Sequence, residues 1–387
     1  MAKHFGYIEG YYGRELTWLQ RLAILTHLSF QSMNTYIYAP KEDPFHRLIW
    51  QKPYPSSRQK IMKQFVDYGK RIGVEVILSI APGLSYDYLS DDDYKLLLKK
   101  IFSFVNMGAK TVALLMDDIP EELPAASRSS FTSLGEAHGL LLEKVLADIR
   151  RENKDANLWF CPTIYTDQFV RGNAAESKYI KDLARTIPES VTILWTGPQV
   201  VSEKLNNKNL GDILKTFRGN VVIWDNFFAN DYAPLRLFIG PYTGRESTIL
   251  ESAKGVLINP TGLFHTDRFI ISLFADFLKN KKTTVKRWDT VADEYSIPQN
   301  FRRAKKFFWS PWTTYTQKDI SKTSLKKLGN LFDELLVKWQ SPLRQEWYPY
   351  ILGLHQDITY LEMKKDGLIP WLNKRYPPII AKRMATR

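Results

Sequence analysis

The chain has 387 residues, of which 44% are hydrophobic and only one, Cys161, is a cysteine. This composition excludes disordered, collagen-like and coiled-coil proteins, and a single cysteine excludes an internal disulfide. No apolar run in the sequence reaches the length needed to span a bilayer. The N-terminal residues MAKHFGYIEGYYG contain no apolar signal segment, so we expect a cytoplasmic protein.

The net charge of +13 is distributed unevenly along the chain. Residues 281–387 contain 21 Lys and Arg against 10 Asp and Glu, whereas residues 1–280 contain 33 against 31. The sequence is therefore a nearly neutral body with a net charge of +2, followed by a basic region with a net charge of +11. This change indicates two domains, 1–280 and 281–387.

The first 280 residues alternate between short strand-like runs and amphipathic segments. Eight strand–helix units over this length predict an α/β fold of the (β/α)8 TIM-barrel type. A doubly wound open sheet is the alternative, but no glycine-rich phosphate turn follows the first strand, which favours the barrel. The predicted strands are 5–10, 35–40, 74–81, 111–117, 158–165, 192–198, 221–227 and 255–260, and helices are expected at 15–29, 57–72, 90–107 and 135–152.

From about residue 281 onward the strand alternation stops and aromatic residues recur at irregular helical spacing. This pattern predicts a small, basic, aromatic-rich helical domain, with helices near 298–310, 320–340 and 343–364.

Two adjacent carboxylates follow the fourth predicted strand, where a barrel enzyme carries its active site. Asp117 and Asp118 come directly after the apolar run 111–116. In a partly dry pocket two such groups cannot both ionise at their ordinary pKa, so one can stay charged while the other acts as an acid. The alternative is that an aspartate here only caps the next helical turn.

Other predicted strands also end in residues suited to binding a sugar ring. Aromatic surfaces with a few convergent polar groups are typical of small-molecule pockets. Each residue also has a purely structural explanation, because the tryptophan could belong to the core, the asparagines to turns and the lysine to the solvated surface. The residues concerned are Lys41, Tyr165, Trp224, Asn226, Asp231 and Asn259.

Metal and nucleophile chemistry find little support in the sequence. The six histidines are scattered and form no HxxxH or Cys–His cluster, so we expect neither a metal nor another cofactor. There is no GxSxG elbow and no P-loop. Cys161 falls inside a predicted strand, which favours a buried, unreactive thiol.

A series of motifs runs through the whole predicted barrel. They are EGYYGR (9–14), NTYIYAPKED (34–43), SIAPGL (79–84), ALLMDDI (113–119), WFCPTIY (159–165), WTGP (195–198), WDNFFANDY (224–232), RLFIGPY (236–242) and GVLINP (255–260). In this order the motifs resemble glycoside hydrolase family 84, which contains the O-GlcNAcases and related β-N-acetylglucosaminidases.

The resemblance implies retaining hydrolysis of β-linked N-acetylglucosamine by substrate-assisted catalysis. In that chemistry the substrate's own 2-acetamido oxygen attacks the anomeric carbon and forms an oxazoline. By position, Asp117 would polarise the acetamide N–H as a carboxylate. Asp118 would protonate the leaving oxygen as general acid and then activate water as general base.

The resemblance also implies a set of substrate contacts. The backbone carbonyl of Gly10 and the side chain of Lys41 would bind sugar hydroxyls, and Tyr12 would line the site. The remaining implied contacts are Asp231 and Asn259 on the O4 and O6 side, Asn226 and Trp224 at the acetamide, and Tyr165 at the reacting region.

The leading hypothesis is therefore an exo-β-N-acetylglucosaminidase that removes O-linked GlcNAc from protein Ser or Thr. A β-N-acetylhexosaminidase or hyaluronidase-like enzyme acting on cell-wall, chitin-derived or hyaluronan saccharides is the alternative. The basic, aromatic C-terminal region leaves open a non-catalytic protein that binds saccharide or nucleic acid. Since no nucleic-acid-binding motif is present, we expect a glycoprotein or oligosaccharide as partner. The oligomeric state stays open.

Overall fold

A computed structural model describes residues 3–314 and 321–363 of the chain. The chain divides into two compact units, the first made of the residues up to Asn226 together with Arg245–Asn259. The second is made of Phe227–Gly244 and the described residues from Pro260 onward. Helix α8 (Phe264–Asn280) belongs to the second unit. A boundary at residue 280 between separately folding domains stays a prediction.

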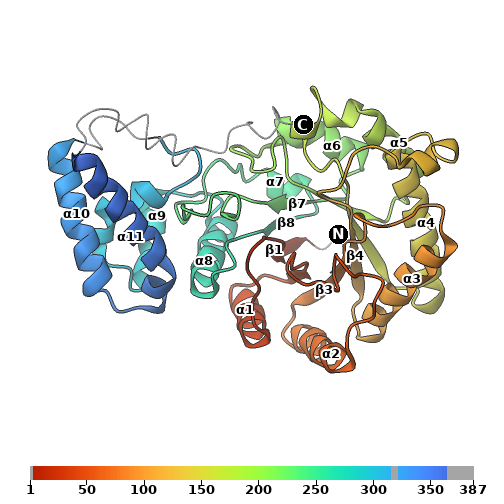
Figure 1. Cartoon of the computed structure of the whole chain (residues 1–387), viewed down its shortest axis with the longest axis horizontal. Coiled ribbons are helices and arrows are strands. Elements are labelled where there is room, and N and C mark those ends of the chain that lie inside the picture. The colour runs from red at the N-terminus through yellow and green to blue at the C-terminus, as the bar shows by residue number, and fades with distance from the viewer. Residues whose placement is uncertain (1–2, 315–320, 364–387) are drawn as a thin grey trace. The chain divides into compact units, whose positions relative to one another are not determined.

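Eight parallel strands of the first unit form a closed barrel, in which β8 pairs with β1 (Figure 1). The predicted (β/α)8 TIM barrel is confirmed, with every strand where the sequence predicts it. Each strand ends earlier than predicted, because the last residues of each motif leave the ladder and turn into a loop. The strands are β1 (His4–Glu9), β2 (Thr35–Tyr38), β3 (Glu75–Ile80), β4 (Thr111–Leu115), β5 (Asn157–Cys161), β6 (Thr192–Trp195), β7 (Val221–Asp225) and β8 (Gly255–Ile258).

Helices of the first unit lie around the outside of the strands (Figure 1). The four predicted ones are confirmed, with α1 beginning later than expected because Thr17 caps it by accepting the Gln20 N–H. No helix among the described residues is long and apolar enough to cross a membrane. The helices are α1 (Trp18–Phe30), α2 (Ser56–Arg71), α3 (Asp91–Asn106), α4 (Leu134–Glu152), α5 (Lys178–Thr186), α6 (Asn207–Thr216) and α7 (Ile249–Ser252).

Alternation along the strands determines which residues reach the mouth of the barrel. The interior is filled by a cluster that includes Ile8, Ala39, Leu115, Trp224 and Leu257. The residue two positions after each of these also points inward, and it lies in the loop that follows the strand. The residues at these positions are Gly10, Lys41, Asp117, Asn226 and Asn259, so strand geometry alone directs five of the predicted site residues to one end of the barrel.

The second unit is helical, as predicted from residue 281 onward. Its further helices are α9 (Val285–Glu294), α10 (Lys322–Val337) and α11 (Pro342–Met363), of which α9 was not predicted. Residue 320, the first of the predicted helix 320–340, lies outside the described residues. So does residue 364, the last of the predicted helix 343–364.

The predicted helix at 298–310 is wrong, because two short 3-10 helices, Gln299–Arg303 and Lys305–Phe308, take its place. Phe301, Ala304 and Phe307 are all buried. Their spacing of three residues matches the three-residue turn of a 3-10 helix and not the 3.6-residue turn of an α-helix.

Five aromatic residues of the second unit lie in its interior. Trp288, Phe301, Phe308, Trp339 and Trp347 are all buried. Phe301 packs on Trp347 with ring centroids 5.5 Å apart, and Trp339 meets Trp347 at 5.4 Å. These five side chains hold helices together and are not available for stacking on bases, whereas Tyr348 of α11 is exposed.

Candidate active site

Asp117 lies at the mouth of the barrel, two positions beyond Leu115, the last residue of β4. Its Oδ2 pairs with the ammonium group of Lys41, which is itself buried and is not the solvated charge that the alternative interpretation required. No described group hydrogen-bonds Oδ1 of Asp117, although this atom is buried. A buried acceptor without a partner is costly, so Oδ1 is an atom prepared to accept a donor from a ligand.

Asp118 reaches the mouth through an unusual backbone conformation. Strand alternation would direct it to the side opposite Asp117, but its φ of 56° is left-handed and turns the side chain back. The Tyr12 hydroxyl donates to Oδ2 at 2.6 Å, and the Tyr165 hydroxyl donates to Oδ1 at 3.0 Å. The next helical turn begins at Ala125, so neither aspartate is a helix cap.

The surroundings of Asp118 favour its ionised form. Burial raises the pKa of this carboxyl, but Lys41, the hydroxyl donors of Tyr12 and Tyr165, and Arg47 outweigh burial and lower its pKa overall. Burial likewise opposes the charge of Lys41, yet Asp117, Tyr12 and Asp118 raise its pKa. The ammonium group of Lys41 therefore lies among carboxylates, and loss of these contacts would favour the protonated form of Asp118.

Arg47 is a site residue that the sequence did not reveal. It hydrogen-bonds the Tyr12 hydroxyl, donates to the backbone carbonyl of Asp118 at 3.3 Å, and lies over the Tyr12 ring at 5.7 Å. A lone arginine in a loop is typical of a solvated charge. The available signal was its position in the same loop as Lys41.

The two asparagines form a connected network with the first and seventh strand ends. The backbone N–H of Gly10 donates to Asn259 at 3.1 Å, and the Asn259 amide donates to Asn226 Oδ1 at 2.9 Å. The indole N–H of Trp224 reaches the same oxygen at 3.0 Å, and Asn226 in turn donates to the Val200 carbonyl at 2.8 Å. These side chains connect the ends of neighbouring strands. The two asparagines are therefore not simply turn residues, as the alternative interpretation held.

Gly10 is required by the close approach of Trp224. A Cβ at this position would lie 2.2 Å from Cζ2 of the indole. Lys41 also lies over the Trp224 ring, with Nζ 5.8 Å from its centroid. The tryptophan therefore belongs to the barrel core and at the same time forms a wall of the mouth.

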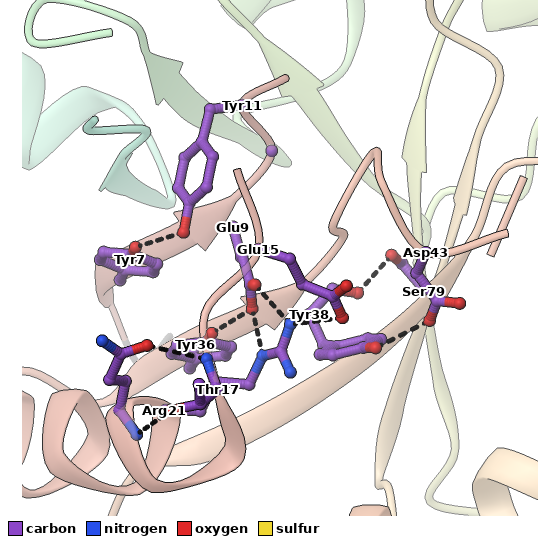
Figure 2. A network of polar contacts seen from close by, with 12 residues as sticks. Tyr7, Glu9, Tyr11, Glu15, Thr17, Arg21, Tyr36, Tyr38, Asp43 and Ser79 are labelled. Carbon is purple, nitrogen blue, oxygen red and sulfur yellow. Dashed lines mark hydrogen bonds and ion pairs between the residues drawn. The ribbon is translucent and has the colours of Figure 1, made fainter. Parts of the chain in front are cut away.

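Fully buried ion pairs support two of these strand ends from outside the barrel. Arg21 of α1 binds both oxygens of Glu9, at 2.8 and 2.7 Å, and Tyr36 donates to Glu9 at 2.5 Å (Figure 2). Arg245 binds Asp225 in the same bidentate manner, at 2.8 and 2.7 Å. Each carboxylate directly precedes a predicted site residue, Gly10 or Asn226, so each pair fixes the backbone from which the site is built.

Two further predictions concern Cys161 and Asp231. Cys161 is buried in the barrel cluster, as expected, and burial raises the pKa of its thiol. Asp231 lies in the second compact unit, where its carboxylate accepts the backbone N–H of Tyr232 at 2.9 Å. Its implied role in binding the sugar stays a prediction.

A model of the β-N-acetylglucosaminidase family matches residues 5–309. The chain belongs to this family. Its predicted membership of glycoside hydrolase family 84 is thereby confirmed. The β-N-acetylglucosaminidase match includes every predicted site residue by position, although it does not test their roles.

Named relatives of this β-N-acetylglucosaminidase family member include Protein O-GlcNAcase of Mus musculus, 31% identical over 282 residues, and that of Rattus norvegicus, 30% identical over 282 residues. The matched part is 73% of this chain and 30% of each relative, so the chain spans about a third of their length. A solved mutant of the Thermobaculum terrenum O-GlcNAc hydrolase has the same fold. Its TM-score is 0.81 at 24% identity, covering 93% of this chain and 83% of that one.

Proposed function

We propose that this chain is a retaining exo-β-N-acetylglucosaminidase that works by substrate-assisted catalysis through an oxazoline intermediate. The observation that carries the proposal is that the two carboxylate oxygens of Asp117 have different surroundings. One carboxylate oxygen is held by Lys41, and the other is buried without a described partner beside Asp118. An acetamide N–H is a donor that suits this free acceptor.

In the first step the acetamide N–H donates to Oδ1 of Asp117, and the acetamide oxygen attacks the anomeric carbon. A bond forms between that oxygen and the anomeric carbon, while the bond to the leaving oxygen breaks. Asp118 transfers its proton to the leaving oxygen, and the negative charge of Asp117 stabilises the positive charge that develops on the oxazoline.

In the second step Asp118 acts as a base. It takes a proton from water, whose oxygen attacks the anomeric carbon and opens the oxazoline. Asp118 is thereby protonated again, and the two displacements leave the anomeric configuration unchanged. The lowered pKa of Asp118 suits this base role, whereas the acid role requires that substrate displace the Tyr12 or Tyr165 hydroxyl.

We propose GlcNAc on protein Ser or Thr as the substrate, since the rodent relatives are named Protein O-GlcNAcases. In this proposal the sugar contacts are Gly10, Tyr12, Lys41, Tyr165, Trp224, Asn226, Asp231 and Asn259. Cell-wall, chitin-derived and hyaluronan saccharides form the competing substrate class. A cytoplasmic location belongs to the same proposal.

The test compares an aryl β-N-acetylglucosaminide with the matching aryl β-glucoside, which lacks the acetamide nucleophile. We expect hydrolysis of the first only, with the β-anomer as the initial product in NMR, and tight inhibition by a thiazoline mimic of the intermediate. Cleavage of both substrates at similar rates would contradict the mechanism. Release of GlcNAc from a glycopeptide, compared with a chitin oligosaccharide, decides between the two substrate classes.

A further inference from the structure

One loop supplies both cations that face the carboxylate pair. We call residues 39–47, between β2 and α2, the β2 loop. Its Lys41 pairs with Asp117, and its Arg47 binds the Tyr12 hydroxyl and the backbone carbonyl of Asp118. The electrostatic balance at both aspartates therefore depends on where this one loop is held.

Asp43 lies in the middle of the β2 loop and is completely buried. Its Oδ2 accepts from the hydroxyls of Tyr38 at 2.7 Å and Tyr54 at 2.9 Å, and pairs with Arg58 at 3.0 Å. Its Oδ1 accepts the backbone N–H of Phe45 at 3.0 Å. A buried carboxylate is costly unless such donors surround it, so these four contacts fix its position closely.

The backbone of Asp43 also shapes the loop on both sides. Its N–H donates to the Pro40 carbonyl at 3.2 Å, and its own carbonyl accepts the His46 N–H at 3.1 Å. The first bond closes a turn around Lys41, and the second leads directly to Arg47. Displacing Asp43 would therefore move both cations.

The ion pair of Asp43 with Arg58 is linked, through further ion pairs, to the buried pair of Arg21 with Glu9. Arg58 also pairs with Glu15 at 3.2 Å, and Glu15 meets Arg21 at 3.3 Å. Arg21 in turn binds Glu9 (Figure 2). Figure 2 shows the contact of Asp43 with Tyr38 and the contacts of Arg21 with Glu9 and Glu15. Arg58 joins these two groups, so the β2 loop is connected to the buried ion pair of the barrel wall.

We propose that Asp43 is a positioning residue, which holds Lys41 and Arg47 in place against the carboxylate pair. The inference rests on the proposed function, because it concerns the aspartates of that reaction. Asp43 touches neither aspartate and acts through the two cations.

A shift in pH dependence follows from this arrangement. If the β2 loop loosens, the cations withdraw, the carboxylate form of Asp118 loses stabilisation, and its pKa rises. The reaction needs Asp118 protonated at the outset, so the alkaline limb of its pH profile moves to higher pH. The charged and titratable groups that face Asp118 are Lys41, Arg47, Tyr12, Tyr165, Cys161 and its neighbour Asp117.

The experiment compares Asp43→Asn and Tyr54→Phe with the unmodified chain. We expect the alkaline limb of kcat/KM, measured on a substrate with a poor leaving group, to move up by roughly half to one pH unit. We expect Asp43→Asn to lower kcat/KM at the optimum roughly tenfold, and Tyr54→Phe to lower it less, since it removes one donor of four. If Asp43→Asn does not fold, Tyr54→Phe carries the same test.

The matched control is Tyr94→Phe, which removes a 2.5 Å hydrogen bond from a tyrosine hydroxyl to Asp148, between α3 and α4. Its pH profile should stay unchanged. Equal losses at every pH for Asp43→Asn and Tyr54→Phe, with the limb unmoved, would reduce Asp43 to a structural role and overturn the proposal.

A crystal structure of the same variants separates this inference from the proposed function. We expect Lys41 to be displaced from Asp117, and an unmoved Lys41 and Arg47 would overturn the positioning role. An unmodified chain that fails to hydrolyse the aryl substrate would refute the proposed function, while the crystal structure would still decide what Asp43 holds.

Discussion

The hydroxyl of Tyr12 donates to Oδ2 of Asp118 at 2.6 Å and accepts a hydrogen bond from Arg47 in turn. Burial and the nearby carboxylates raise the pKa of Tyr12 to about 12, against the opposing effect of Lys41. Tyr12 therefore stays protonated throughout the range of enzyme assays. Tyr12 is 40% exposed, so a bound substrate can reach it and displace its hydroxyl. This contact favours the ionised form of Asp118.

Replacing Tyr12 by Phe should make Asp118 easier to protonate. A hydrogen bond to the charged form lowers a pKa, so its loss raises the pKa of Asp118 and moves the alkaline limb of kcat/KM to higher pH, by roughly half to one unit. The pH profile on a phenyl β-N-acetylglucosaminide measures this. Tyr348→Phe, at an exposed tyrosine of α11, is the control and should not shift the limb. A shift to lower pH would contradict the assigned contact.

Replacing Asp118 by Asn should affect substrates according to their leaving groups. Amide nitrogen cannot protonate the leaving oxygen, so kcat/KM on a poor leaving group should fall about 10²- to 10⁴-fold. A dinitrophenyl leaving group needs no proton and should lose far less in the first step. A series of aryl substrates measures the slope of rate against leaving-group pKa. A loss independent of the leaving group would rule out the acid role.

Replacing Asp117 by Asn should harm every substrate to a similar degree. The amide lacks the negative charge that stabilises the oxazoline, so we expect kcat to fall about 10²-fold or more whatever the leaving group, and the thiazoline mimic to bind more weakly. The change also leaves Lys41 buried without its anion. Thermal unfolding of the same variant is therefore the control that separates lost stability from lost catalysis. Unchanged thiazoline affinity in a folded variant would refute the role of Asp117.

Much of this arrangement could be predicted from the sequence because it follows from the periodicity of strands. Lys41, Asn226 and Asn259 each lie two positions beyond an inward apolar residue, so the strand pattern places them at the mouth. The left-handed backbone of Asp118 could not be predicted, since aspartate at this position carries no glycine-like signal.

The roles of Arg47 and Asp43 could not be predicted from the sequence, for another reason. Their contacts join segments 35 to 71 residues apart, or depend on donors such as Tyr54 whose direction only the folded loop defines. A charged residue in a loop has the same local pattern whether it is solvated or buried. The 3-10 helices at 299–308 differ from the prediction in a similar way, because three-residue and 3.6-residue periods are not separable over so short a segment.

Replacing Gly10 by Ala tests the packing of the mouth. The added methyl group would lie 2.2 Å from Cζ2 of Trp224, so the indole must move and its bond to Asn226 must break. We expect kcat/KM to fall at least tenfold, by analogy with other displacements of substrate-positioning groups. The control is Gly211→Ala in α6, where an added Cβ meets nothing within 4 Å and helix propensity improves. Full activity of the Gly10 variant would contradict the close contact.

Breaking the buried ion pair behind β1 should cost stability as well as activity. Arg21→Met leaves the carboxylate of Glu9 buried with only the Tyr36 hydroxyl to offset its charge, so the free energy of unfolding should fall by about 3–5 kcal/mol. Adding Glu9→Gln removes the unpaired charge, and the double variant should regain part of that loss. Denaturant unfolding measures both. The control is Lys63→Met, whose exposed pair with Asp67 on α2 should contribute less than about 0.5 kcal/mol. If Arg21→Met and Lys63→Met cost the same, the pair is not the anchor that its burial indicates.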